Sequence, residues 1–120
     1  MAENIIKEKA DNFAVRVVKA YKYLTTQKHE KRMSDQLYRC GTSVQAMIAE
    51  SQYAQSTADF INKLEIALKE ANESRSWINL LYKTEYFDQR MYDSMYKDIN
   101  EIIIILISIV RTTKRNNGLL

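Results

Sequence analysis

The sequence predicts an all-α protein, an antiparallel up-down-up-down four-helix bundle, and three observations lead to this fold class. The 120 residues contain two glycines and no proline, although a chain of this length would ordinarily hold roughly eight and six. Sheets need turn-forming residues at every reversal of the chain, so there is little room for strands. Apolar residues recur in steps of four and three, which is the spacing of one helix face. The connections between these periodic stretches are short, and short connections require antiparallel neighbours.

The first two helices are expected over residues 5–26 and 31–53. The apolar side of the first is formed by residues at helical spacing: Phe13, Val17, Tyr21 and Leu24. The second carries a heptad seam: Met33, Leu37, Cys40, Val44, Met47 and Ser51. Gly41 lies inside this seam, where glycine costs about 1 kcal/mol relative to alanine. Either a neighbouring element approaches closely at this position, or Gly41 is a tolerated weak point.

The third and fourth helices are expected over residues 57–83 and 89–114, because each follows a good capping residue. Ser56 and Asp59 match the pattern in which a serine caps the helix and the acid returns a bond to the serine amide. Asp88 precedes the fourth helix. The third seam keeps the 4-3 step throughout: Phe60, Leu64, Ala67, Ala71, Ser74, Ile78 and Leu81. The fourth seam is formed by Met91, Met95, Ile99, Ile102, Leu106 and Ile109.

The run from Ile102 to Ile107 is unusually apolar. Its β-branched residues alone would suit a strand, but its position within a long 4-3 pattern favours a helix. Because the run is apolar around the whole helix, one bundle cannot bury all of it. We therefore expect Ile103, Ile104 and Ile107 to contact another copy of the chain in a homo-oligomer.

The length suits a single domain over residues 1–120. The formal net charge of +3 permits an anionic partner without requiring one. The single cysteine excludes an intrachain disulfide and favours a reducing, cytoplasmic setting. The start of the chain lacks the apolar core of a signal peptide. The most apolar run, Ile102 to Val110, is much shorter than the roughly 20 residues that span a bilayer.

No combination of residues predicts an enzyme. His29 is the only histidine and lies in a polar connection, so the paired Glu-x-x-His motifs of a di-metal bundle cannot be formed. Cys40 falls on an apolar seam without a histidine to activate it and is expected to be a core residue. No glycine-rich phosphate loop or metal-ligand spacing is present. We expect a non-enzymatic protein with no cofactor, metal, membrane or small-molecule substrate.

Several polar residues fall near the second and third seams: Gln36, Arg39, Ser43, Glu50, Glu70 and Glu73. One interpretation is surface charge with local pairs, such as Glu65 with Lys69. The other is a network of ion pairs and hydrogen bonds at a bundle or subunit boundary. The sequence does not distinguish them.

Basic residues cluster in two places: Arg16, Lys19 and Lys22 on the first helix, and Arg111, Lys114 and Arg115 at the end of the fourth. The second group also suits the negative end of a helix dipole. The eight tyrosines could stack on bases, although amphipathic packing explains most of them. These features allow nucleic-acid binding without requiring it.

Residues 36–81 carry a family resemblance. The segments are QLYRCGTSV at 36–44, IAE at 48–50, AQS at 54–56, DF at 59–60, KLEIALKEANE at 63–73, Trp77 and Leu80-Leu81, with Thr113 and Lys114 further on. Their order resembles the bacterial four-helix-bundle family of 23S rRNA intervening-sequence proteins, which is related to the accessory proteins of diversity-generating retroelements. Many members have two consecutive arginines where this chain has Tyr38 and Arg39, so half of that basic pair is missing.

The resemblance implies a bundle that assembles as a ring-like homopentamer, binds RNA or another nucleic acid through basic surface and has no enzymatic activity. The leading hypothesis is therefore a cytoplasmic homo-oligomer that binds structured RNA by charge. The residues expected to bind nucleic acid are Arg16, Lys19, Lys22, Arg39, Arg111, Lys114 and Arg115. The alternative is a protein-binding scaffold or accessory subunit that makes no direct contact with nucleic acid.

Overall fold

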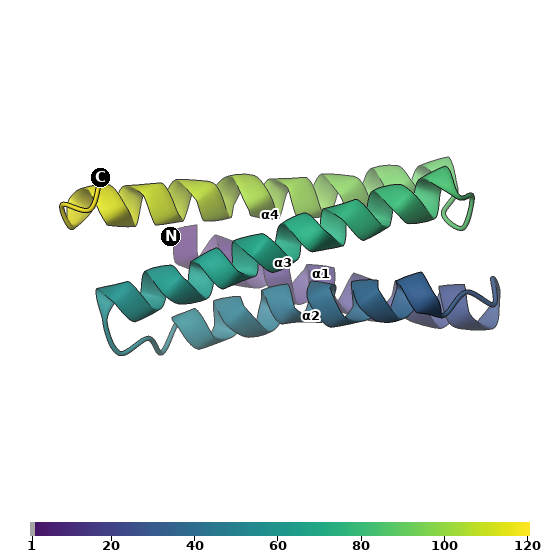
Figure 1. Ribbon diagram of the computed structural model, residues 1–120, viewed down its shortest axis with the longest axis horizontal. Helices are drawn as coiled ribbons and strands as arrows, with labels where there is room; N and C mark the ends of the chain where they lie inside the picture. Colours follow the sequence, from purple (N-terminus) through teal and green to yellow (C-terminus); the bar gives the residue numbers. More distant parts are fainter. Residues whose placement is uncertain (1) are drawn as a thin grey trace.

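Four helices form an elongated bundle in the computed structural model, which describes residues 2–120. They are α1 (Ala2–Thr26), α2 (Arg32–Ser51), α3 (Thr57–Lys83) and α4 (Gln89–Asn116). The bundle measures 49 × 22 × 21 Å. The α1–α2 and α3–α4 connections lie at one end, and the α2–α3 connection lies at the other (Figure 1). Each helix packs against two antiparallel neighbours, which confirms the predicted all-α four-helix bundle.

The helix boundaries differ from the prediction by a few residues. α1 begins at Ala2 instead of residue 5, and α4 continues to Asn116 instead of ending at residue 114. α2 ends at Ser51, two residues early. There the amides of Gln52 and Tyr53 bond to carbonyls three residues back, at 3.2 and 3.0 Å, so the last turn tightens and the helix stops.

The core is built from the predicted seams. In α3 all of the predicted positions except Phe60 are buried, and in α4 all except Met91. In α2, Met33 and Met47 are only partly buried, and Ile48 is buried at 0% exposure. α2 packs against both α1 and α3, so its buried face is wider than a single heptad seam.

Gly41 marks a close approach between two helices, as one of the two interpretations predicted. A Cβ atom at this position would lie 2.8 Å from Cγ2 of Val17 on α1. Real Cβ atoms do not approach this closely. The absence of a side chain at Gly41 therefore lets α1 and α2 pack against each other.

The predicted caps of α3 and α4 are present. The Ser56 hydroxyl accepts a hydrogen bond from the Asp59 amide at 3.0 Å, and the Asp88 carboxylate accepts one from the Met91 amide at 2.8 Å. One detail of the prediction was wrong. Asp59 accepts its return bond from the amide of Gln55, at 3.2 Å, and not from the amide of Ser56.

α2 has a cap that the sequence pattern did not predict. The carboxylate of Glu30, one residue before the N-cap position, accepts hydrogen bonds from the amides of Met33 at 3.1 Å and Ser34 at 2.8 Å. It also accepts one from the Ser34 hydroxyl at 2.7 Å. His29 precedes it with a φ of 54°, a left-handed conformation that turns the chain before the cap. Burial raises the pKa of Glu30, but the hydrogen bonds from Ser34 and Met33 outweigh it and leave the pKa below its ordinary value.

We expect Glu30→Ala to lower the free energy of unfolding by about 1–2 kcal/mol at neutral pH, because three donors at the start of α2 lose their acceptor. The folded-state pKa is depressed, so this stabilisation is complete above the unfolded-state pKa and disappears as the pH falls through the folded-state value. Urea unfolding of both proteins at pH 7 and pH 3 tests this. Glu50→Ala, at an exposed position of the same helix, is the control. If the difference in the free energy of unfolding between wild type and Glu30→Ala is the same at pH 7 and pH 3, the Glu30 carboxylate does not cap α2.

Candidate nucleic-acid interface

The predicted cations lie in two groups at opposite ends of the bundle. α1 and α4 run antiparallel, and Arg16 on α1 bonds to Asp98 and Ser94 on α4. The first group therefore lies beside the N-terminal half of α4, near the α1–α2 connection. The second group lies at the C-terminal end of α4, at the other end of the molecule (Figure 1). The fold does not bring the two groups into one surface patch.

Two of the predicted cations are engaged within the chain. Arg16 forms its ion pair with Asp98 across the α1–α4 boundary, and Lys114 pairs with Glu65 on α3 at 3.0 Å. Among the side chains of residues 4–120, which are those that the structure describes, four others are exposed and form no ion pair: Lys19, Lys22, Arg111 and Arg115. Of the seven predicted cations, only these four can meet an external anion without breaking a contact to the described side chains.

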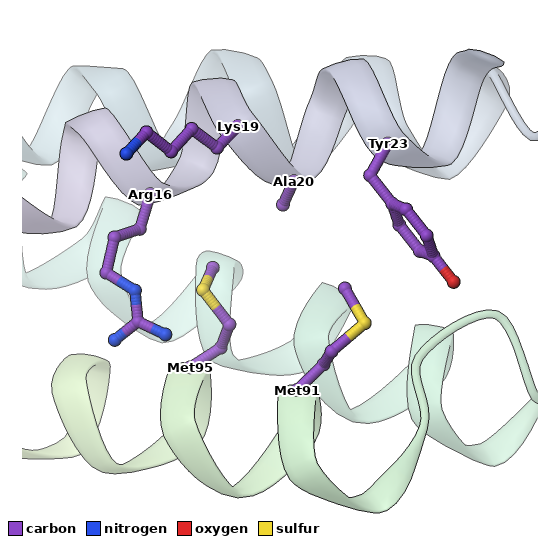
Figure 2. Close-up of a pocket in the computed structure, with 6 residues that line it drawn as sticks. All are labelled: Arg16, Lys19, Ala20, Tyr23, Met91 and Met95. Carbon is purple, nitrogen blue, oxygen red and sulfur yellow. The ribbon is translucent and has the colours of Figure 1, made fainter. Parts of the chain in front are cut away.

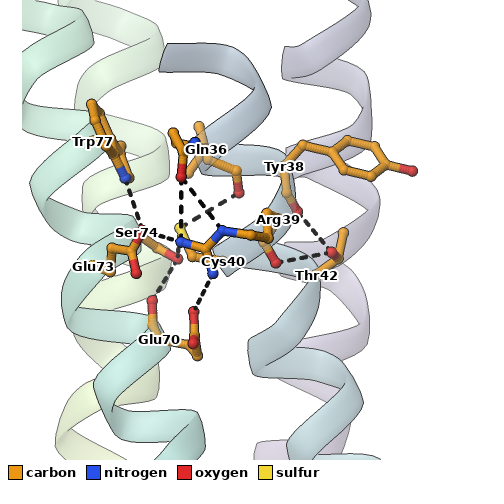
Figure 3. A network of polar contacts seen from close by, with 10 residues as sticks. Gln36, Tyr38, Arg39, Cys40, Thr42, Glu70, Glu73, Ser74 and Trp77 are labelled. Carbon is orange, nitrogen blue, oxygen red and sulfur yellow. Dashed lines mark hydrogen bonds and ion pairs between the residues drawn. The ribbon is translucent and has the colours of Figure 1, made fainter. Parts of the chain in front are cut away.

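Arg39 is also engaged, in a network that joins α2 to α3 (Figure 3). Its guanidinium pairs with Glu70 at 3.3 Å and with Glu73. The carbonyl of the Gln36 side chain accepts from the same guanidinium at 3.4 Å, and the Trp77 indole donates to Glu73 at 3.1 Å. The network interpretation of these polar residues is therefore confirmed for Arg39, Glu70, Glu73 and Gln36.

The alternative of local pairing is wrong for Glu65. Its carboxylate pairs with Lys114 on α4 and not with Lys69 one turn away. Partner choice here depends on the register between α3 and α4, which spacing along one helix does not show.

Cys40 lies behind the Arg39 network and is fully buried. The hydroxyl of Ser74 lies 3.2 Å from its sulfur. Burial raises the pKa of the Cys40 thiol to about 11, which disfavours the nucleophilic thiolate. This agrees with its predicted place in the core.

The cations on α1 belong to a longer basic stretch of the chain, residues 16–32, that the helix-by-helix sequence pattern did not single out. We call it the basic end: Arg16, Lys19, Lys22, Lys28, Lys31 and Arg32. Residues 16–32 contain one acid, Glu30, and its carboxylate is occupied by the α2 cap. Lys31 pairs with Asp35 at 2.8 Å. Lys28 and Arg32 are exposed and unpaired within the described part of the chain. The sequence signal that could have identified the basic end is the near absence of acidic residues from residues 16–32. It was missed because this stretch runs from α1 into α2.

Two open hollows flank the basic end, one on each side of α1. The first lies between α1 and α4 and has a volume of about 320 Å³. It is lined by Arg16, Lys19, Ala20, Tyr23, Met91 and Met95 (Figure 2). The second lies between α1 and α2 and has a volume of about 520 Å³. It is lined by Val18, Tyr21, Lys22, Asp35 and Tyr38. Each hollow combines an apolar, aromatic lining with a cation.

The prediction of an oligomer interface was wrong for one of its three residues. Ile103 is 4% exposed and belongs to the core, because a turn of about 100° per residue puts it on the same side as Ile99 and Leu106. Ile104 and Ile107 do face outward, with 60% and 38% exposure. They form the apolar part of α4 that the bundle leaves uncovered.

No group of three or more metal-ligating side chains lies together among the residues that the structure describes. None of the described helices is both long and apolar enough to cross a membrane.

A family model described as 23S rRNA-intervening sequence protein matches residues 2–108. The chain belongs to this family. The match of the 23S rRNA-intervening sequence family includes the whole basic end, but stops before Arg111 and Arg115. The resemblance noted up to Lys114 therefore extends beyond the matched region.

A solved structure from Bacteroides thetaiotaomicron is very similar to this member of the 23S rRNA-intervening sequence family. It is described as a protein with unknown function from the S23 ribosomal protein family. The two chains are 50% identical, the similarity covers 92% of this chain and 99% of the other, and the TM-score is 0.91. No curated protein sequence matches the chain. Neither description names an enzymatic activity.

Proposed function

We propose that this family member binds RNA through the basic end, acts as a cytoplasmic homo-oligomer and catalyses no reaction. The observation that carries the proposal is the charge of residues 16–32. Six cations occur there with one acid, and that acid is buried in the cap of α2. Four of the six form no ion pair with the side chains of residues 4–120: Lys19, Lys22, Lys28 and Arg32.

The chemistry of the basic end suits a polyanion. Cations without an internal partner release condensed counterions from a phosphate backbone when they bind it, and this release drives association. The RNA in the family's description supports this choice of polyanion. The free thiol of Cys40 supports a reducing compartment such as the cytoplasm.

RNA affinity should fall steeply with salt. If the four unpaired cations each neutralise one phosphate, the slope of log K against log salt should be about −3 to −4, and affinity should fall about 50- to 150-fold per protomer between 50 and 200 mM salt. Fluorescence anisotropy with a labelled ribosomal RNA hairpin measures this slope. If this hairpin does not bind the protein at 50 mM salt, the proposed function is refuted.

The homo-oligomer is supported by the exposed Ile104 and Ile107 on α4; the resemblance implies a pentamer. We expect the double variant Ile104→Lys, Ile107→Lys to give smaller species in light scattering, because two charges would have to be desolvated at the interface. Leu80→Lys, at an aliphatic position of α3 with 42% exposure, is the control and should leave the size unchanged. An unchanged oligomer in the double variant would place the interface elsewhere.

The alternative function is a protein-binding scaffold, and the hollow between α1 and α4 favours it. Met91, Met95 and Tyr23 line this hollow, and methionine-rich surfaces adapt to the side chains of a partner. A scaffold would use the cations for solubility alone, so its RNA affinity would be negligible even at 50 mM salt.

A further inference from the structure

The hollow between α1 and α2 places an exposed aromatic ring beside an exposed cation. Tyr38 is 41% exposed, and Lys22 is exposed on the other side of the hollow. Of the eight tyrosines, which all lie in the described part of the chain, only Tyr38 and Tyr53 are exposed. Tyr53 follows α2, fifteen positions beyond Tyr38, at the end of the bundle opposite the basic end (Figure 1). Tyr38 is therefore the one exposed tyrosine near the basic end.

The wall behind Tyr38 is held in place. The Tyr21 ring packs edge-to-face against Tyr38, with ring centres 4.9 Å apart and an angle of 61°. The Tyr21 hydroxyl donates to Asp35 at 2.9 Å, and Lys31 donates to the other oxygen of the same carboxylate at 2.8 Å. Lys31 and Asp35 thus hold the Tyr21 ring, and Tyr21 in turn supports the Tyr38 ring before any ligand arrives.

Asp35 does not make the hollow repel an anion. Its carboxylate charge is compensated by the ammonium of Lys31, and each of its oxygens already accepts a hydrogen bond. Hydrogen bonds from Lys31 and then Tyr21 hold the pKa of Asp35 below its ordinary value. Lys22 and, one turn earlier on α1, Lys19 remain without an ion pair in the described residues.

We propose that this hollow binds an unpaired nucleotide of single-stranded RNA, with the base stacked on Tyr38 and the flanking phosphates on Lys22 and Lys19. Aromatic rings interleaved with cations are the means by which proteins bind single strands, because only an unpaired base offers its face for stacking. A duplex would satisfy the cations but could not use the ring. The assignment rests on the RNA binding proposed above and adds which form of RNA is bound.

The hollow between α1 and α4 suits a stacked base less well. Its aromatic residue, Tyr23, is half-buried against the core, and the remaining apolar lining is aliphatic or thioether. Of its two cations, Arg16 is already bonded to Asp98 and Ser94, and Lys19 is free but has no exposed ring beside it in this hollow. An exposed ring and a cation without an internal partner occur together only in the hollow of Tyr38.

The experiment compares a short single-stranded RNA with the duplex of the same sequence, both at 50 mM salt. We expect Tyr38→Ala to weaken single-strand binding about 5- to 150-fold, with no change in duplex binding or in the salt slope. Tyr38→Phe should bind like wild type because it keeps the ring. Tyr53→Ala, an equal loss of an exposed tyrosine far from Lys22, should also bind like wild type. Full single-strand affinity in Tyr38→Ala would overturn the assignment, as would loss of affinity in Tyr38→Phe.

A photocrosslink locates the base without relying on a truncated side chain. RNA carrying 5-iodouridine, irradiated in complex with the wild-type protein, should crosslink to Tyr38, since the halogenated ring reacts with an aromatic residue stacked on it. Crosslinks mapped only to other residues would overturn the assignment.

The two proposals fail differently. If no RNA binds wild type at 50 mM salt, both fall. If wild type binds RNA and substitution of Lys19 and Lys22 abolishes the binding, but Tyr38→Ala is unchanged, the proposed function stands and the nucleotide site falls.

Discussion

Reversing Lys19 and Lys22 together to glutamate should weaken RNA binding roughly 100-fold or more at 50 mM salt. Each lysine that neutralises a phosphate contributes about tenfold to the affinity at this salt concentration, and each introduced carboxylate adds repulsion. Both side chains are exposed and form no ion pair with the described side chains, those of residues 4–120, so stability should change little. Anisotropy titrations of the two proteins, with circular dichroism to confirm the fold, measure the effect.

Arg16 is left out of this variant on structural grounds. Its guanidinium pairs with Asp98 and bonds to Ser94, so a glutamate there would face a carboxylate across the α1–α4 boundary. Loss of binding could then follow from loss of the fold.

The matched control is Lys63→Glu with Lys69→Glu, the same change of charge on α3. Both positions lie in the first half of α3, which starts at the α2–α3 connection, at the end of the bundle opposite the α1–α2 connection (Figure 1). The control should lose RNA affinity by several-fold at most, because its net charge becomes less positive. Equal losses in the two double variants would mean that RNA responds to overall charge and that the basic end is not the interface. If the protein is instead a scaffold, wild type should not bind RNA. The variant with Lys19 and Lys22 changed to glutamate should then still bind the protein partner.

Gly41→Leu should lower the free energy of unfolding by about 2–3 kcal/mol. Even a Cβ atom would lie 2.8 Å from Val17, and overpacking a filled core typically costs about 1–3 kcal/mol. The better helix propensity of leucine returns less than about 1 kcal/mol of this. Urea unfolding followed by circular dichroism gives the value, and an unchanged m-value would confirm that the two-state comparison holds.

A double-mutant cycle assigns this loss to the contact with Val17. Val17→Ala alone should also destabilise, because it removes buried methyl groups. Combined with Gly41→Leu it opens space for the leucine, so the double variant should be more stable than the sum of the single effects by about 1–2 kcal/mol. Ala46→Leu, at an exposed position of α2, is the control for propensity. Additive single effects would mean that Gly41 is a tolerated weak point and that the close approach has no energetic weight.

Local features of this bundle could be predicted because their causes are local. The caps at Ser56 and Asp88 depend on residues three positions away. The α3 seam depends only on the pitch of one helix. The cap by Glu30 was missed because it comes from one residue before the usual position, after a left-handed histidine. That conformation leaves no pattern in residue type.

The candidate interface was predictable only in part, because the availability of a cation depends on its neighbours in space. Lys19 and Lys22 were identified from the sequence and are free, whereas Arg16, Arg39 and Lys114 are engaged by acids on other helices. Each of these acids is 31 or more positions away along the chain. Helix register sets such pairs, and no spacing within one helix indicates it.

By itself the sequence determined that the chain is helical, where the helices begin and end within a few residues, and which side of each is apolar. These follow from the 3.6-residue pitch, the capping chemistry and the lack of turn-forming residues. Tertiary structure alone decided that Gly41 meets Val17, that Ile103 is covered while Ile104 is not, and that Tyr38 stands beside Lys22 at the basic end. Contacts between helices depend on their rotation and register, which result from packing all four together.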